Sequence, residues 1–451
     1  MFVYEIGLRL KKIWGDELTM KNTYLAPSRR HFLKSSLATL TVASASANIS
    51  KFAHAEGNDV IKIGLIGCGN RGPSAAADAM LADDGVRLVA MADVFMDRIK
   101  NKRDMLKEKF PEQVLVDDDH CFDGFDGYEN VIKSGVDVVL IACASVFHPQ
   151  YAQAALEAGK HVFVEKPHGI DPPGVRQMKQ LCEMAKRKKL CLVSGLMNRF
   201  IPGVQETMKR IHDGAIGDIV AIEENFLRAP YVLRGRKEGD SEIEYQFRNF
   251  YHFSWLSGDD VTQSLVHNLD KALWAMQGRT PVKAHGLGGR SASFGEVYGD
   301  VFDHHSVVYD FDDGAKIYAY CRTQHNCHGG VSDVIMGTKG KCDLLKHRIT
   351  GETNWQYDGP YGSGFKIEHQ ELFKAIRQGE IIVSDYMVNS TMIAVMGQMA
   401  CYSGKQLRWD EVYKSDFTFG PKDGDFSTKP PKVPNCYGNY PVAVPGMTKV
   451  I

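Results

Sequence analysis

A Gly-x-Gly-x-x-Gly motif follows directly on a short apolar run, residues 61–66, and an alanine-rich helical pattern comes after it. The glycines of the motif are Gly67, Gly69 and Gly72. This order predicts a strand, a tight turn and a helix whose first N–H groups have no partner inside the helix. Such a turn, which here also holds Asn70 and Arg71, lets a phosphate approach the backbone and the positive end of the helix. The motif therefore predicts a site for the pyrophosphate of a dinucleotide.

An acidic residue stands where such a site needs one. A second apolar run, residues 86–92, ends at Asp93, about 20 residues after the motif, where a carboxylate would accept a hydrogen bond from the ribose 2′-hydroxyl. No Arg or Ser comes directly after Asp93, which favours NAD over NADP. Arg98 and Arg103 keep that choice open, because either guanidinium could bind a 2′-phosphate.

Strand-like and helix-like segments alternate from about residue 56 to residue 194, which predicts a doubly wound parallel sheet, the Rossmann type of α/β domain. Ligands of such sheets bind beyond the carboxyl ends of the strands. Six residues fall at or just past predicted strand ends, where a nicotinamide would lie. They are Ala144, Ser145, His148, Glu165, Lys166 and Asn198. We therefore expect them to contribute to the cofactor site.

The pattern of predicted secondary structure changes after residue 195. Alternating segments separated by turn signals predict an open, mostly antiparallel sheet, so residues 195–410 are expected to form an α+β domain for substrate binding and oligomerisation. A predicted helix over residues 262–276 places Gln263, His267 and Asp270 on one face. The proline- and glycine-rich residues 411–451 predict an extended tail.

Composition excludes several classes of function. The net charge of the 451 residues is −1, with no long basic block in the folded region, which makes nucleic acid a poor partner. The ten cysteines form no Cys-x-x-Cys pair, so neither a zinc site nor a disulfide framework is indicated. The pair His304-His305 lacks further ligand-type residues at metal spacing and is interpreted as part of a strand. We expect no metal.

The N-terminal residues 1–55 are interpreted as a targeting segment. Residues 28–34 contain a twin-arginine pattern, a mildly apolar stretch follows, and residues 53–55 offer a small-x-small cleavage site. The apolar stretch is too short and too polar for stable membrane insertion. The pattern predicts export in the folded state to the periplasm, with a tightly bound NAD carried along. The start codon could be Met1 or Met20.

Four motifs in this order resemble the Gfo/Idh/MocA family of oxidoreductases. They are the glycine motif at 67–72, Glu165-Lys166-Pro167, Gly195-Leu-Met-Asn-Arg-Phe200 and Val266-His-Asn-Leu-Asp270. The resemblance covers the chain from Ile61 to about Trp409. It implies an N-terminal Rossmann domain, a C-terminal open-sheet domain that builds homodimers or homotetramers, and NAD(P)-dependent oxidation or reduction of a sugar or cyclitol hydroxyl.

By position, the resemblance implies that Lys166 orients the reacting hydroxyl and that His267 is the general acid/base. Hydride transfer from a secondary alcohol needs a base for the hydroxyl proton, and histidine and a desolvated lysine can both serve. Many members of the family carry an acid one helical turn before the histidine, where this chain has Gln263. Gln263 cannot relay a proton as a carboxylate does. Asp270 is expected either to partner the imidazole or to cap local structure.

The leading hypothesis is an NAD-dependent oxidoreductase acting on a carbohydrate, for example making or reducing a 3-keto-glycoside. The candidate substrate contacts are Arg199, Arg228, Tyr231, Gln263, His267 and Asp270, with His148 as a further one. Trp255 could stack on a sugar or fill a core. The alternative is an NAD-dependent glycosidase that oxidises a ring hydroxyl, eliminates the aglycone, adds water and reduces the ring again. It needs a further acid/base, for which Tyr231, His252 and His148 are candidates. A third hypothesis is a sugar-binding protein without catalysis, suggested by Gln263.

Overall fold

The computed structural model describes residues 60–421 and 425–451. The first of its two sheets has six strands in the order β3-β2-β1-β4-β5-β6, and every neighbouring pair is parallel. Its strands are β1 (Ile61–Ile66), β2 (Val86–Asp93), β3 (Cys121–Asp123), β4 (Val138–Ile141), β5 (His161–Val164) and β6 (Leu192–Ser194). Every residue of β4 is buried, as expected for a parallel strand that is covered on both faces. The predicted doubly wound parallel sheet is confirmed.

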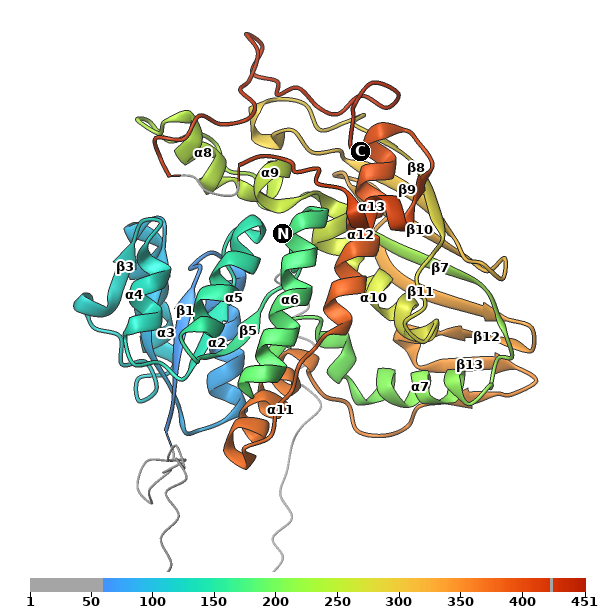
Figure 1. Ribbon diagram of the computed structural model, residues 1–451, viewed down its shortest axis with the longest axis horizontal. Helices are drawn as coiled ribbons and strands as arrows, with labels where there is room; N and C mark the ends of the chain where they lie inside the picture. Colours follow the sequence, from blue (N-terminus) through green and yellow to red (C-terminus); the bar gives the residue numbers. More distant parts are fainter. Residues whose placement is uncertain (1–59, 422–424) are drawn as a thin grey trace, which may run out of the picture. The chain divides into compact units, whose positions relative to one another are not determined.

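Five helices connect these strands and cover the sheet (Figure 1). They are α2 (Arg71–Ala82), α3 (Met96–Lys109), α4 (Gly127–Lys133), α5 (His148–Glu157) and α6 (Pro172–Lys188). The start of α6 follows local rules: Asp171 caps it by accepting from the backbone N–H of Gly174 at 2.8 Å, and Pro172 occupies its first position. The helix ends at Lys189, which adopts the left-handed conformation.

The second sheet has nine strands in the order β14-β13-β12-β11-β7-β10-β9-β8-β15. They are β7 (Ile219–Arg228), β8 (Lys283–Gly289), β9 (His304–Asp310), β10 (Lys316–Thr323), β11 (Gly330–Gly337), β12 (Gly340–Asp343), β13 (Arg348–Gly351), β14 (Trp355–Gln356) and β15 (Leu407–Arg408). Only β7 and β10 pair in parallel; the other pairs are antiparallel. The predicted second sheet, open and mostly antiparallel, is confirmed.

Longer helices join the two sheets into one unit that comprises residues 58–451. They are α7 (Pro202–His212), α10 (Val266–Ala275), α11 (Gly364–Gln378) and α12 (Tyr386–Ser403). Because α12 is apolar on nearly all sides, it lies inside the protein, beside α6 and α10 (Figure 1). Helix α11 packs on α2 and adds Leu372 and Phe373 to the core beneath the parallel sheet. The predicted domain boundaries stay a prediction.

Several short elements connect the strands and the longer helices. They are α8 (Glu242–Arg248), α9 (Ser254–Ser257), α13 (Trp409–Lys414), the 3₁₀ helices η2 (Asp118–His120), η3 (Ser145–Phe147), η4 (Met197–Phe200), η5 (Phe250–His252), η7 (Glu296–Tyr298) and η8 (Leu344–Lys346), and the π-helix η6 (Val261–Leu265). The predicted helix over residues 262–276 is therefore a π-turn followed by α10. The π-turn carries Gln263, whose backbone carbonyl contacts Lys166.

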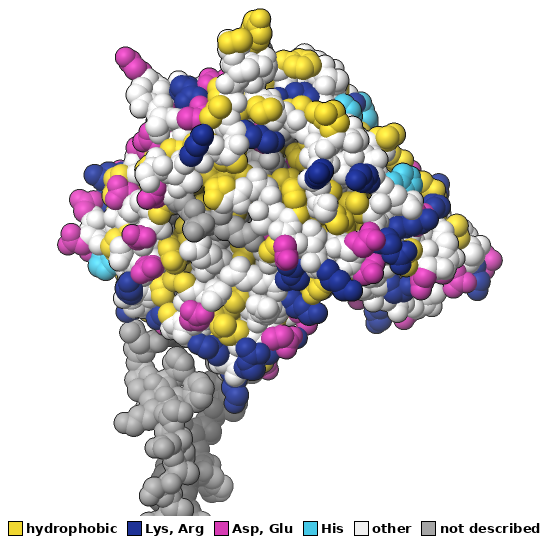
Figure 2. Space-filling model, turned by 45° about the horizontal axis from the view of Figure 1, so that its top comes forward, with side chains coloured by type: hydrophobic (Ala, Val, Ile, Leu, Met, Phe, Trp, Pro, Cys, Tyr) yellow, Lys and Arg dark blue, Asp and Glu magenta, His cyan; other side chains and the backbone are white. Residues whose placement is uncertain are grey.

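The twin-arginine pattern and the predicted cleavage site lie outside the described residues. Among the residues that the structure describes, no helix has both the length and the apolarity needed to span a bilayer. On the face seen in Figure 2, acidic and basic side chains are interspersed, and hydrophobic side chains gather between them near the centre and the top.

Candidate active site

The glycine turn has the shape that a bound pyrophosphate requires. Gly67 has a φ of +100°, and a Cβ there would come within 2.5 Å of the backbone of Ala142. A Cβ on Gly72 would lie 1.9 Å from the carbonyl oxygen of Gly67, so this glycine lets α2 pack on the turn. A Cβ on Gly69, by contrast, would meet no atom within 4 Å, and Gly69 lines two neighbouring cavities. Asn70 gives α2 no side-chain cap, so the helix N–H groups stay available to an anion.

Alanine at Gly69 and Gly72 should therefore have different effects. Gly69→Ala should leave the stability unchanged and weaken NADH binding by about tenfold or more, because its methyl group occupies the space for the phosphates. Gly72→Ala should lower the free energy of unfolding by about 1–3 kcal/mol, because α2 must shift away from the turn. Thermal unfolding and NADH fluorescence titration of both variants measure the two effects. A Gly69→Ala protein that binds NADH as tightly as the wild type would contradict the placement of the phosphates.

Asp93 ends β2 beside this turn. Its Oδ2 accepts from the backbone N–H of Cys68 at 2.8 Å and its Oδ1 from that of Phe95 at 3.1 Å. Burial raises the pKa of Asp93, and Arg98, 3.7 Å away, opposes that shift. Arg103 instead donates to Asp118 at 2.5 Å. Of the two arginines that left the choice between NAD and NADP open, Arg98 is therefore paired with Asp93 and Arg103 with Asp118.

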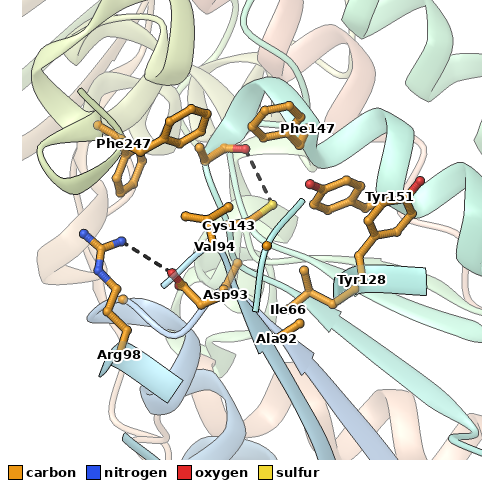
Figure 3. Close-up of a pocket in the computed structure, with 16 residues that line it drawn as sticks. Ile66, Ala92, Asp93, Val94, Arg98, Tyr128, Cys143, Phe147, Tyr151 and Phe247 are labelled. Atoms are coloured by element: carbon orange, nitrogen blue, oxygen red, sulfur yellow. Dashed lines mark hydrogen bonds and ion pairs between the residues drawn. The ribbon is translucent and has the colours of Figure 1, made fainter. Parts of the chain in front are cut away.

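A cavity of about 560 Å³, its open mouth included, lies beyond the strand ends. Gly67, Gly69, Asp93 and Ala144 from the predicted set line it. Figure 3 shows Asp93 and Arg98 on one side and Tyr128 and Tyr151 on the opposite side, with Phe147 and Phe247 above. Sequence reasoning missed the aromatic members of this wall, which are Tyr128, Phe147, Tyr151, Phe247 and Phe250. Phe147 could have been found, because it follows Ala144 and Ser145 at a strand end; Phe247 and Phe250 come from a distant segment.

Arg71 and Glu165, both predicted to bind the cofactor, form an ion pair. Nε of Arg71 donates to Glu165 at 2.5 Å, its Nη1 donates to Asp78 at 2.9 Å, and its Nη2 lies 3.6 Å from Glu368. Burial, followed by the charge of Glu165, raises the pKa of Glu368 on α11 well above its usual value. The arginine therefore links the glycine turn to the end of β5 and to α11. Arg71 and Asn70 border the second cavity.

Lys166 contacts the backbone of the π-turn. Its Nζ donates to the carbonyl oxygen of Gln263 at 2.5 Å. In a regular α-helix this carbonyl would accept from the amide four residues on, which is that of His267, whereas a π-turn moves the pairing by one residue. The side chain of Gln263 points elsewhere: its Nε2 donates to Ser145 Oγ at 2.9 Å and to the carbonyl of Ser257 at 2.6 Å. Lys166 thus pairs with a neutral carbonyl of the residue at which the family resemblance would imply an acid.

His267 follows the π-turn on α10. Its Nδ1 is buried and has no hydrogen-bond partner among the described residues. Burial lowers its pKa well below the usual 6.5, and the positive charges of Lys166 and Lys271 lower it further. Arg71 and His168 act in the same direction. The imidazole is therefore neutral at pH 7 and able to accept a proton.

Arg199 and Asp270 are paired with each other. Nη2 of Arg199 donates to Oδ1 of Asp270 at 2.8 Å, and Ser390 on α12 donates to the same oxygen at 2.7 Å. The guanidinium also lies 4.5 Å from the ring centre of Trp274 and 4.3 Å from that of Tyr386. The carboxylate of Asp270 contacts Arg199 and Ser390. These contacts fit the expectation that Asp270 stabilises local structure better than the expectation that it partners the imidazole of His267. The pair joins η4, α10 and α12.

Arg228 and Tyr231 come together beside the π-turn η6. Nη2 of Arg228 donates to Asp260 at 2.5 Å, and its guanidinium lies 3.5 Å from the ring centre of Tyr231. The hydroxyl of Tyr231 lies 3.0 Å from Ser264 Oγ, next to Gln263 in the chain. The Oδ2 atom of Asp260 is buried without a hydrogen-bond partner among the described residues. Tyr231 also lines the second cavity beside Asn70 and Arg71, so this cluster faces the glycine turn. Sequence reasoning did not identify Asp260 and Ser264 as residues of the site.

The remaining predicted residues have mainly structural contacts. Both ring nitrogens of His148 face carbonyl oxygens, Pro167 at 2.8 Å and Cys143 at 3.1 Å, which ties the ends of β4 and β5 together. Ser145 accepts from Gln263, and Asn198 is buried in η4. His252 is buried and its pKa is lowered by burial to about 4.

Two further interpretations can be compared with the structure. Trp255 is buried, and its Nε1 donates to Gln246 at 2.7 Å, so it fills a core instead of facing a sugar. His305 lies in β9 and contacts Asp259 at 3.1 Å. Within the described residues, no three or more His, Cys, Asp or Glu side chains are grouped so that they could hold a metal ion.

Residues 61–196 match the family model described as an oxidoreductase family with an NAD-binding Rossmann fold, GFO_IDH_MocA. The chain is 27% identical over 218 residues to the myo-inositol 2-dehydrogenase of Thermotoga maritima, covering 48% of this chain and 55% of that protein. It is 27% identical over 342 residues to the scyllo-inositol 2-dehydrogenase (NAD(+)) of Bacillus subtilis, covering 72% and 89%. A glycosyl hydrolase family 109 protein of Solibacter usitatus is 35% identical over 115 residues, 24% of this chain and 25% of its own. The chain thus spans about half the length of the first of these relatives.

The fold is also that of solved structures. The scyllo-inositol dehydrogenase of Lactobacillus casei, solved with NAD(H) and scyllo-inositol, aligns with a TM-score of 0.58 at 20% identity, covering 78% of this chain and 99% of its own. At that identity the likeness shows a common fold. The family model, in contrast, matches the whole parallel sheet, including the glycine turn, Asp93 and Lys166. Residues 61–196, which hold the whole parallel sheet, are therefore similar to the NAD-binding domain of Gfo/Idh/MocA oxidoreductases.

Proposed function

We propose that this chain is an NAD-dependent oxidoreductase that transfers a hydride between the nicotinamide and a secondary hydroxyl or ketone of a carbohydrate or cyclic polyol. The observation that carries the proposal is the contact of Lys166 with the π-turn that leads into His267, at the end of the sheet that holds the glycine turn. Asp93 supports NAD over NADP, because its carboxylate would repel a 2′-phosphate and Arg98 is paired with it. The inositol dehydrogenases among the relatives support a polyol substrate.

NAD, when bound, accepts or returns the hydride; the protein must orient the hydroxyl and handle its proton. The ammonium group of Lys166 has three donors, and one is fixed on the carbonyl of Gln263. Either of the others can donate to the reacting oxygen, holding it in position and stabilising negative charge there. Neutral His267 accepts the hydroxyl proton during oxidation and returns it during reduction. Arg228, Tyr231 and the unpaired Oδ2 of Asp260 offer donors and an acceptor for neighbouring hydroxyls.

Purified full-length protein tests this proposal directly. It is denatured to identify any released nucleotide, and is then incubated with NAD+ and myo-inositol, scyllo-inositol or simple glycosides while NADH absorbance is followed. Substrate-dependent NADH, or reduction of the matching ketone by NADH, is the expected result. A protein that binds NAD and sugar tightly but turns over neither would favour the sugar-binding hypothesis suggested by Gln263.

A redox-neutral glycosidase is the second candidate, favoured by the similarity to glycosyl hydrolase family 109 proteins. Of the residues considered for its additional acid/base, Tyr231 borders a cavity, whereas His148 and His252 are buried. The discriminating measurement is release of p-nitrophenol from p-nitrophenyl glycosides without added acceptor. Aglycone release at constant NAD content would support the glycosidase, and NADH formed in step with oxidised sugar would support the dehydrogenase.

We also propose export through the twin-arginine pathway and a homodimer or homotetramer, on the basis of residues 28–34 and of the family resemblance. Replacing both arginines of the pattern by lysine should keep the protein in the cytoplasm in a fractionation experiment. Light scattering of the purified protein measures its oligomeric state.

A further inference from the structure

The last part of the chain borders the nucleotide cavity. The ring of Phe426 lies 5.0 Å from that of Phe125, 5.5 Å from that of Phe95 and 6.2 Å from that of Phe247, which lines the cavity itself. We propose that Phe426, Lys432 and Tyr440 of the C-terminal segment form an outer wall of the nucleotide site, which holds the aromatic roof over the adenosine end of the bound dinucleotide and slows its release. This inference rests on the proposed function, because it requires a dinucleotide in the cavity.

A neighbouring opening supports the assignment. It is bordered on one side by Asp425, Ser427 and Thr428 and on the other by the region around Phe125. Tyr128, Phe147 and Tyr151 line both this opening and the nucleotide cavity. The C-terminal residues therefore stand where the adenosine end of the cavity meets solvent. A nucleotide that leaves by this end has to pass them.

The same segment is anchored to α8, the helix that carries Phe247. The carbonyl of Lys432 accepts from Gln246 at 2.8 Å, and the hydroxyl of Tyr440 donates to Glu242 at 2.5 Å. Lys432 also forms an ion pair with buried Asp300 at 2.6 Å. Two of these contacts hold α8 itself, so the C-terminal segment fixes the helix that closes the cavity.

The charge on the closing segment fits the ligand. Arg248 on α8 and Arg234 in the preceding loop line the second cavity together with Arg98, beside Gly69 and Asn70. Arg248 lies on the helix that the C-terminal residues hold in place, where it also pairs with Asp97 and Asp240. The backbone N–H of Arg234 donates to Asn249, directly after that helix, at 3.3 Å. A roof with aromatic rings above one end and guanidinium groups above the glycine turn matches an adenosine joined to a pyrophosphate. The C-terminal segment thus acts on nucleotide binding through α8 as well as through Phe426.

The test measures NADH release from the full-length protein in a stopped-flow chase with excess NAD+, with thermal unfolding recorded for each variant. Phe426→Ala should release NADH about tenfold faster, with an association rate near that of the wild type, since affinity differences between related complexes lie mostly in the dissociation rate. Tyr440→Phe, which removes only the hydrogen bond to Glu242, should also speed release and keeps the test valid if Phe426→Ala does not fold. Tyr437→Ala is the matched control, because that side chain of the same segment is 83% exposed.

Each outcome decides the inference. Faster release from Phe426→Ala and Tyr440→Phe, with Tyr437→Ala unchanged, supports the wall. Release at the wild-type rate from folded variants would overturn this inference and leave the proposed function intact. A wild-type protein that binds neither NADH nor NADPH in equilibrium titration would overturn the proposed function, and the wall with it.

Discussion

Lys166→Met should lower kcat for hydride transfer by a factor of about 10²–10⁴, the usual contribution of a group that handles a proton or orients the reacting oxygen. The reason is geometric: Nζ of Lys166 is held on the carbonyl of Gln263, so its remaining donors have a fixed direction that a thioether cannot reproduce. NADH affinity should stay within a few-fold of the wild type, because Lys166 is not among the residues that line the nucleotide cavity. Single-turnover kinetics with the identified polyol and NADH titration measure the two quantities.

The matched control is Lys160→Met, the same chemical change just before the opposite end of strand β5, and it should leave kcat unchanged. Lys166→Arg should remain impaired, because the planar guanidinium cannot replace a compact ammonium group on the same carbonyl. Activity of Lys166→Met within threefold of the wild type would remove this lysine from the mechanism. Loss of NADH binding along with activity would instead assign Lys166 to the cofactor.

The parallel sheet could be predicted because its signals are local. Strand, glycine turn and helix occur within residues 61–82, and Asp93 ends the next strand, so each residue of the fingerprint can be located from its own neighbourhood. The second sheet could be predicted from the alternation of apolar and polar residues, except in β8, where glycines interrupt that alternation. Strand β8 (Lys283–Gly289) contains three glycines, a composition typical of loops. In the structure these glycines let β8 approach α12 closely: a Cβ on Gly286 would lie 2.6 Å from Cys401 Sγ.

The contacts that decide what each side chain does are mostly non-local. Asp270 and Arg199 are 71 residues apart, and the sequence does not indicate that they form an ion pair. The same holds for the aromatic roof, because Phe247 lines the cavity and Phe426, far away in the sequence, packs against its ring. A position in a motif predicts where a residue lies more reliably than what it contacts.

Gln263 illustrates the difference. The residue type suggests a lost proton relay, whereas the structure uses its backbone carbonyl for Lys166 and its side chain for Ser145. The π-turn that contains this carbonyl has no signature in the alternation of apolar and polar residues, since π-helices are rare and mostly short. Gln263, which departs from the pattern that the family resemblance implies, thus lies within the π-turn η6.

The pH profile of oxidation should identify His267 as the proton acceptor. Only its neutral form accepts a proton, so the rate falls when the pH drops through the pKa of the folded enzyme. Burial and the charges of Lys166 and Lys271 hold that pKa well below 6.5, so we expect the acid limb of kcat/KM on the acid side of 6.5 and full activity at pH 7. His267→Ala should lower kcat by a factor of about 10²–10⁴ and should abolish this limb. His325→Ala, at an exposed position, should leave both unchanged. An acid limb at or above pH 6.5, or one that persists in His267→Ala, would assign the proton to another group.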